Sequence, residues 1–167
     1  MSEAVLDVLN QQPDLSKIKH INTIGTVSTF KVRQVNDRGS RTQLVRVLTD
    51  VRNYQAIKRE KDLLHYLNQF SEFIQFNEIR KVGYHYLQFF DFVGKKNVQK
   101  IVQKKGPYST KKTSKLLSDI LAVLEHVHSL GFVHGDIKPS NILVGEAQSY
   151  LINWDKAIPS LSSYESE

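Results

Sequence analysis

The sequence predicts an α+β fold in which a mainly β-stranded half precedes a mainly helical half. Short β-rich runs separated by turn residues fill most of residues 18–90 and are interrupted by one helical pattern at 53–69. The composition changes after Gly94, where lysines accumulate. Beyond this point, the longest helical pattern of the chain occupies residues 110–130.

The first half is expected to begin with an accessory helix at 3–12, which Pro13 ends. Two β-rich runs between Ile18 and Val35 flank a Gly-Thr-Val-Ser turn and predict a hairpin. A third strand is expected at 42–48. The following segment, 53–69, has the apolar spacing of an amphipathic helix.

Two further strands, at 73–79 and 84–90, complete a five-stranded antiparallel sheet with one helix. The second half is expected to contain a short helix at 98–102 and a long helix that starts at a Ser109 or Thr110 cap and stops at Gly131. Two short strands, at 142–144 and 150–153, follow. The apolar stripe expected on the long helix consists of Leu117, Ile120, Leu121, Leu124, Val127 and His128.

Composition places the chain among ordinary globular proteins. The 167 residues are 40% hydrophobic and 24% charged, which suffices for one buried domain or two small lobes. No cysteine is present, so the chain can form neither a disulfide nor a thiolate metal site. No apolar run approaches the roughly 20 residues that span a bilayer, and no secretory signal opens the sequence. We therefore expect a cytoplasmic protein.

The net charge of +6 is concentrated in one stretch. Eight lysines and no acidic residue lie between Phe92 and Ser118, all of them within Lys95–Lys115. The stretch is either a solvated face or a patch for an acidic protein, a membrane surface or nucleic acid. It lacks interleaved arginines and aromatic residues, so we do not expect specific nucleic-acid recognition.

The most informative motif is His-Gly-Asp-Ile-Lys-Pro-Ser-Asn-Ile-Leu-Val at 134–144. Its Asp-x-Lys-x-x-Asn spacing resembles the catalytic loop of eukaryotic-like Ser/Thr protein kinases. The element order from Ile18 to Ile158 also resembles that family. The resemblance implies a kinase-like N-lobe at 18–94 after an N-terminal extension, 1–17. It further implies a truncated, mainly helical C-lobe at 95–158, followed by a tail at 159–167.

The resemblance also implies roles for the motif residues. Asp136 falls where the family aspartate orients the substrate hydroxyl. Lys138 matches the lysine that neutralises charge on the transferred phosphoryl group, and Asn141 matches an amide ligand of magnesium. Gly135 replaces the arginine that is usual between His134 and the aspartate.

The next family motif is altered. Asn153 replaces the aspartate whose carboxylate binds magnesium, and an amide oxygen is a weaker ligand for this hard cation. Asp155, two residues on, is an alternative metal ligand that can compensate. Trp154 stands at the position of the family phenylalanine and is expected to pack with His134 and Leu64.

The nucleotide-binding half is altered as well. Of the glycine-rich hairpin only Gly25 remains, and the β carbons of Val27 and Phe30 are expected to hinder close approach to phosphates. Arg46 aligns with the strand-three lysine, and Glu60 aligns with the helix glutamate that pairs with it. Arg46 and Glu60 are expected either to form an ion pair or to be two separate, solvent-exposed charges.

Lys31 and Arg33 are rival candidates for the strand-three position. The site implied by the resemblance therefore holds ATP and Mg²⁺ with weakened binding. We expect a pseudokinase that acts through a protein partner, with an active Ser/Thr protein kinase as the alternative. An incomplete C-lobe is also expected to expose apolar surface around 110–130, through which the chain binds a partner or forms a homodimer.

Overall fold

The structure, a computed structural model, describes residues 3–24, 27–37, 39–49, 54–94 and 96–160. These form two compact units. The first comprises the described residues up to Lys61 together with Gln75–Phe92. The second comprises Asp62–Ile74 together with the described residues from Val93 onward, so the division falls within helix α2.

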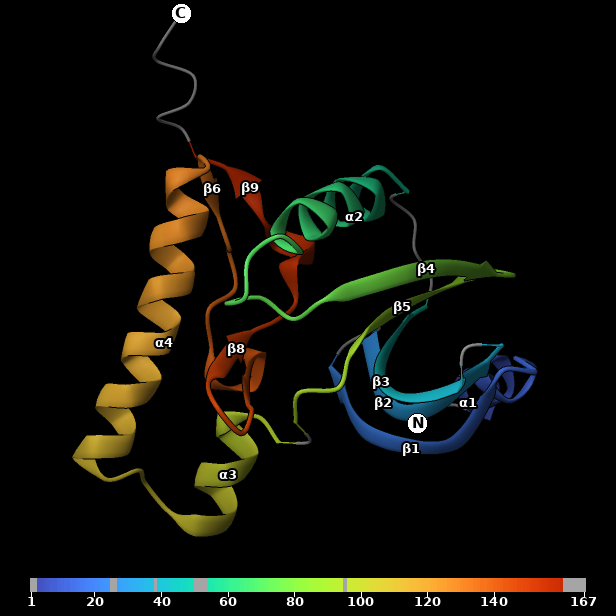
Figure 1. The fold of residues 1–167 in the computed structure, drawn as a ribbon, viewed down its shortest axis with the longest axis horizontal. Helices are drawn as coiled ribbons and strands as arrows, with labels where there is room; N and C mark the ends of the chain where they lie inside the picture. Colours follow the sequence, from blue (N-terminus) through green and yellow to red (C-terminus); the bar gives the residue numbers. More distant parts are fainter. Residues whose placement is uncertain (1–2, 25–26, 38, 50–53, 95, 161–167) are drawn as a thin grey trace, which may run out of the picture. The chain divides into compact units, whose positions relative to one another are not determined.

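The first unit is built on a five-stranded antiparallel sheet with the strand order β1-β2-β3-β5-β4 (Figure 1). This confirms the predicted sheet with one helix between its third and fourth strands. Its elements are α1 (Glu3–Asn10), β1 (Leu15–Ile24), β2 (Val27–Asn36), β3 (Gly39–Leu48), α2 (Tyr54–Leu67), β4 (Phe76–Val82) and β5 (His85–Asp91).

Alternation along β3 gives the sheet two different faces. Val45 and Val47 point to one face and pair with Phe89 and Leu87 of β5, whereas Arg46 between them points to the other. The face of the two valines forms the core of the first unit.

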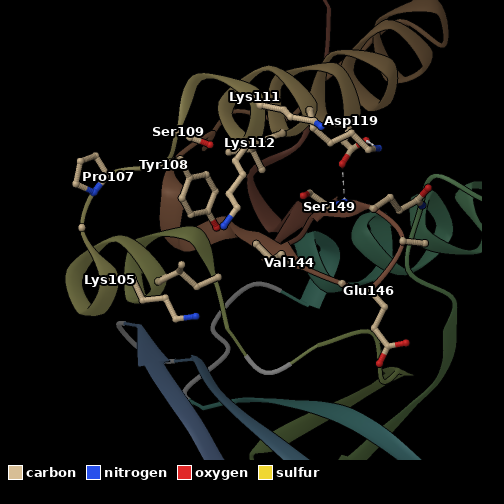
Figure 2. A pocket seen from close by; sticks show the side chains of 17 residues that line it. Lys105, Pro107, Tyr108, Ser109, Lys111, Lys112, Asp119, Val144, Glu146 and Ser149 are labelled. Carbon is tan, nitrogen blue, oxygen red and sulfur yellow. Dashed lines mark hydrogen bonds and ion pairs between the residues drawn. The ribbon is translucent and has the colours of Figure 1, made fainter.

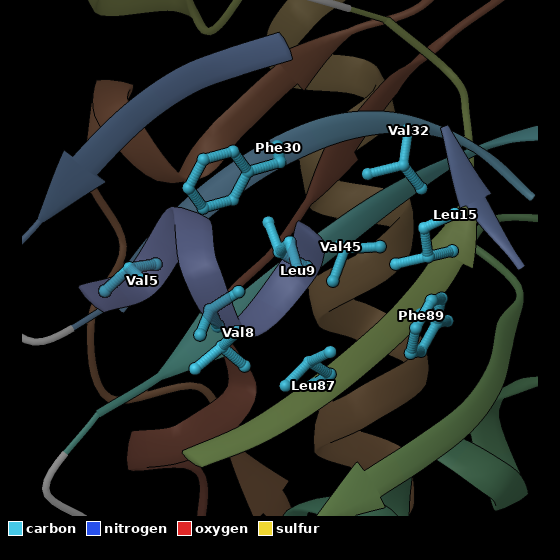
Figure 3. Packing of buried hydrophobic residues seen from close by; sticks show 10 residues of the cluster. Val5, Val8, Leu9, Leu15, Phe30, Val32, Val45, Leu87 and Phe89 are labelled. Atoms are coloured by element: carbon cyan, nitrogen blue, oxygen red, sulfur yellow. The ribbon is translucent and has the colours of Figure 1, made fainter. Parts of the chain in front are cut away.

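Helix α1 covers this core. Val5, Val8 and Leu9 follow helical spacing and pack with residues of β1, β2, β3 and β5, including the fully buried Phe30 (Figure 3). The helix is therefore part of the core of the first unit, rather than the accessory element expected from the sequence.

The second unit is mainly helical, and α4 packs against the short strands β6 and β8 (Figure 1). None of the helices in the described ranges is both long and apolar enough to cross a membrane. Besides the end of α2, the elements of the second unit are α3 (Val98–Lys105), α4 (Thr110–Ser129), β6 (Phe132–Val133), the 3-10 helix η1 (Pro139–Asn141), β7 (Ile142–Val144), β8 (Ser149–Leu151), the 3-10 helix η2 (Trp154–Lys156) and β9 (Ile158–Pro159).

The buried face of α4 differs from the expected stripe. Ile120, Val123 and Val127 are buried, whereas Leu117 and Leu121 are 54% and 61% exposed. Leu124 is half-buried and His128 is exposed, so the buried face is shifted toward Val123 relative to the expected stripe. The fourth strand begins at Phe76, three residues later than predicted. Phe73 and Ile74 precede it and are buried residues of the second unit.

Candidate active site

The catalytic-loop motif lies between β6 and β7 in the second unit. At its start Gly135 has a φ of 77°. A Cβ atom on this residue would lie 2.6 Å from the carbonyl oxygen of Lys156. Both the positive φ and the close approach favour glycine. The structure thus gives a local reason for glycine where the family pattern has an arginine.

His134 connects this loop to the segment after β8. Its ring is buried, and Nδ1 accepts a hydrogen bond of 3.1 Å from the backbone N–H of Asp136. Because Nδ1 accepts, the ring proton is on Nε2, which lies 3.1 Å from the carbonyl oxygen of Ile152 and donates to it. The His134 side chain therefore joins the catalytic loop to the segment after β8.

Trp154 packs against this histidine. The two ring centroids are 4.5 Å apart in an edge-to-face arrangement, which confirms the predicted packing of His134 with Trp154. Phe73 also contacts the indole, with centroids 5.7 Å apart. Leu64, the third expected member, is buried in the same unit.

The predicted catalytic residues are brought together around the carboxylate of Asp136. Oδ2 accepts hydrogen bonds from Lys138 Nζ at 2.6 Å and from Asn141 Nδ2 at 3.0 Å. Lys156 Nζ lies 3.5 Å from Oδ1. The hydrogen bond from Lys138, supported by Asn141 and the charge of Lys156, lowers the pKa of Asp136 against the opposing effect of burial.

This arrangement keeps the Asp136 carboxylate ionised at neutral pH. Its side chain is 22% exposed, so a hydroxyl from solvent can reach it. An ionised carboxylate can orient a hydroxyl, and the two ammonium groups beside it can neutralise charge on a phosphoryl group nearby. Lys156 was not anticipated from the sequence.

The two amides of the expected metal site bind each other. Asn141 Nδ2 donates to the carbonyl oxygen of Asp136 at 2.8 Å as well as to its carboxylate, which fixes the orientation of this amide. Its Oδ1 then accepts a hydrogen bond of 2.7 Å from Asn153 Nδ2. Asn153 has a φ of 68°, in the left-handed region that asparagine tolerates better than most residues.

This donor set fits magnesium poorly. Magnesium prefers charged oxygen ligands, and here one amide oxygen already accepts an N–H donor. Asp155, the third expected ligand, is an exposed residue of η2. Among the described residues no group of three or more His, Cys, Asp or Glu side chains is placed to hold a metal ion.

A second cluster lies on the other face of the sheet in the first unit. Arg46 Nη1 donates to Glu60 Oε1 at 2.8 Å, and both side chains are at most 5% exposed. Of the two alternatives left open by the sequence, the structure shows the ion pair and not two solvent-exposed charges. Gln88, which pairs with Arg46 across the sheet, donates from Nε2 to Glu60 Oε2 at 2.8 Å. The signal for this contact in the sequence is a glutamine in the otherwise apolar centre of β5.

The rival residues of β2 make other contacts. Lys31 Nζ lies 4.5 Å from the centroid of the Phe92 ring, and Arg33 donates to Ser40 Oγ. Arg46 is therefore the basic residue that pairs with Glu60. Gly25, the remaining glycine of the hairpin, lies outside the described residues.

The role expected for Phe30 needs correction. Its side chain is fully buried in the core under α1, on the face that also carries Val45. The ring therefore does not project toward the face of Arg46. Val27, the other residue expected to hinder phosphates, is the first residue of β2.

Comparison with known proteins agrees with this geometry. The family model described as "Protein kinase domain" matches residues 19–156. "cAMP-dependent protein kinase, catalytic subunit-like" of Caenorhabditis elegans is 26% identical over 138 residues, which cover 79% of this chain and 34% of that protein. "Serine/threonine-protein kinase F" of Synechocystis sp. is 36% identical over 65 residues, which cover 38% of this chain and 13% of the relative.

A third relative, "Calcium-dependent protein kinase 12" of Arabidopsis thaliana, is 28% identical over 103 residues, covering 54% of this chain and 19% of the relative. The matches therefore span no more than 34% of the length of these three proteins. The family model covers most of the chain, and it includes both the catalytic-loop motif and the Arg46–Glu60 pair. The chain belongs to the protein kinase domain family.

Proposed function

We propose that this chain acts by binding a protein partner, as a pseudokinase with weak or no use of ATP. The observation that carries the proposal is the hydrogen bond of 2.7 Å from Asn153 Nδ2 to Asn141 Oδ1. In the family, the corresponding aspartate and asparagine hold magnesium on the nucleotide phosphates. Here a metal ion would have to displace an N–H donor and would gain no carboxylate at position 153.

The Arg46–Glu60 pair adds to this argument. Arginine has a planar, delocalised charge and replaces lysine poorly as a point charge on phosphates. Its Nη1 donates to Glu60, which also accepts from Gln88. A phosphate contact by Arg46 would therefore compete with its buried hydrogen bond to Glu60.

The proposed partner surface is the exposed face of α4. Leu117 and Leu121 lie one helical turn apart and are each more than half exposed. Two exposed leucines on one helix face form the start of an apolar contact surface. Either another protein or a second copy of this chain occupies it. Sedimentation of the chain and of the double variant Leu117→Ser/Leu121→Ser measures association through this face. A chain that stays monomeric and binds no partner through this face would contradict this part of the proposal.

An active Ser/Thr protein kinase is the second candidate function. It is favoured by the retention of all three catalytic-loop residues in one hydrogen-bonded cluster around an ionised Asp136. The relatives are named as protein kinases, and such proteins use ATP with Mg²⁺.

Calorimetry with ATP, with and without Mg²⁺, separates the two candidates. For a pseudokinase we expect ATP affinity that Mg²⁺ changes by less than about threefold, and no phosphate transfer above the level of Asp136→Ala. Transfer of phosphate from ATP that requires Mg²⁺ and disappears in Asp136→Ala would overturn the proposal in favour of the active kinase.

A further inference from the structure

A cavity of about 750 Å³ lies within the second unit, on the side of α4 that faces α3 (Figure 2). Its lining comes from α3, the linker 106–109, the first turns of α4 and the segment 144–149, which contains the turn between β7 and β8. Its volume falls in the range of cavities that hold small ligands or a few residues of a peptide. Asp136, Lys138 and Asn141 of the catalytic loop do not line it.

The rim of this cavity is positively charged. Lys105 comes from α3, and Lys111, Lys112 and Lys115 come from α4. Lys115 is paired with Asp119, whose other oxygen accepts the backbone N–H of Ser149 at 2.9 Å.

The charge of Asp119 is therefore used to join α4 to β8. Within the described part of the chain, the ammonium groups of Lys105, Lys111 and Lys112 form no ion pair with a carboxylate. Glu146 is the other acidic residue of the lining, so the cations outnumber the acids. The lining therefore carries a net positive charge, which favours a ligand with negative charge.

The lining also contains apolar side chains. Ile101 of α3, Leu116 of α4 and Val144 of β7 are half-buried. Tyr108 extends toward the same space in Figure 2, and burial raises the pKa of its hydroxyl, which therefore remains a hydrogen-bond donor. A polyanion without apolar groups would leave this floor without contacts, so the combination favours a ligand that carries both kinds of group.

We propose that this cavity binds an acidic peptide segment of a partner protein. An apolar side chain of the peptide lies on Ile101, Leu116 and Val144, and its carboxylates pair with Lys105, Lys111 and Lys112. This goes beyond the proposed function, because either activity of the catalytic loop is compatible with it. It also gives a defined role to the lysine-rich stretch, of which only part lines the cavity.

Selection of a random peptide library displayed on phage against the full chain tests the proposal. We expect the enriched peptides to combine net negative charge with an apolar residue. Their affinity is then measured by fluorescence polarisation on the chain and on variants of two opposite walls, Lys112→Glu and Ala147→Glu. Both variants are expected to weaken binding about tenfold or more with an unchanged unfolding temperature.

Lys104→Glu is the matched control. It changes the same charge in the same lysine-rich stretch, but Lys104 does not line the cavity. We expect its effect on peptide affinity to stay within about twofold. Lys112→Gln serves as a second variant if Lys112→Glu lowers the unfolding temperature.

Three results would overturn the proposal. The first is a selection without enrichment of acidic peptides. The second is equal weakening by Lys104→Glu and Lys112→Glu, which indicates diffuse attraction by the whole stretch. The third is tighter binding of a mixed-sequence RNA oligonucleotide, or of phosphatidylserine vesicles, than of the selected peptide, with the same sensitivity to Lys112→Glu.

Discussion

Asn153 donates a hydrogen bond of 2.7 Å to the side-chain oxygen of Asn141. These two residues occupy the positions at which a protein kinase presents two oxygen ligands to magnesium. Two facing oxygens need a cation between them, whereas an amide N–H facing an oxygen does not. The hydrogen bond between Asn153 and Asn141 therefore forms without a cation between the two side chains.

Asn153→Asp is expected to convert this contact into a metal-dependent one. Without Mg²⁺ the carboxylate faces Asn141 Oδ1 with no donor, which costs about 1–3 kcal/mol of unfolding free energy. Added Mg²⁺ should restore stability and increase ATP affinity at least about tenfold. Urea unfolding and ATP calorimetry, each with and without Mg²⁺, measure both effects.

Asn153→Ala is the control, since it removes the hydrogen bond without adding a carboxylate. It should lose stability and gain no response to Mg²⁺. If Asn153→Asp also fails to respond to Mg²⁺, the substitution at position 153 is not what limits metal binding.

Glu60→Gln is expected to destabilise the first unit strongly. Glu60 accepts from both Arg46 and Gln88 in a buried environment, and an amide at this position cannot accept from both through two oxygens. Breaking a buried pair from one side costs about 3–5 kcal/mol. Urea unfolding should show this loss, with Glu125→Gln on the exposed side of α4 as a control that changes stability by less than about 0.5 kcal/mol.

Replacing both partners tests whether the loss reflects an uncompensated charge. The double variant Arg46→Met/Glu60→Leu should be more stable than Glu60→Gln, since no buried charge remains. A double variant that is less stable than the single one would show that the pair itself contributes the stability.

Much of the site could be predicted where the signal is local. The Asp-x-Lys-x-x-Asn spacing places Asp136, Lys138 and Asn141 within six residues, and a 3-10 turn then brings them together. The contacts of Lys156 and Asn153 could not be predicted in the same way. They depend on the left-handed backbone of Asn153 and the turn after it, which no periodicity indicates.

The faces of α4 show a second limit. Its sequence contains two overlapping apolar rows, one with Leu117 and Leu121 and one with Ile120, Val123 and Val127. Helical spacing alone fits both rows. The contacts with β6 and β8 determine which row is buried, and these are tertiary contacts.

Asp14→Asn is expected to weaken the first unit in a pH-dependent way. Asp14 accepts two hydrogen bonds from the Arg80 guanidinium, at 2.8 and 2.7 Å, and these join the segment before β1 to β4. They lower the pKa of Asp14 from 3.8 to about 2. Since the folded-state pKa is the lower one, the stabilisation is complete above pH 4 and is lost as the pH falls toward 2.

The expected loss at pH 7 is at most about 2 kcal/mol, since both side chains are about one-quarter exposed. The unfolding temperatures of the parent and Asp14→Asn should differ at pH 7 and converge near pH 2. Asp62→Asn, an exposed carboxylate of α2, is the control. A difference that is the same at both pH values would mean that the Asp14 charge does not contribute.

Gly135→Ala is expected to destabilise the catalytic loop for two separable reasons. The backbone has a φ of 77°, and the added Cβ would approach the Lys156 carbonyl oxygen to 2.6 Å. Gly106→Ala isolates the first reason, because Gly106 has a φ of 79° and no atom within 4 Å of an added Cβ. We expect about 1 kcal/mol for Gly106→Ala and about 2–4 kcal/mol for Gly135→Ala in urea unfolding. Equal losses would show that the loop moves away from Lys156 at no cost, in which case the close approach does not explain why glycine replaces the family arginine.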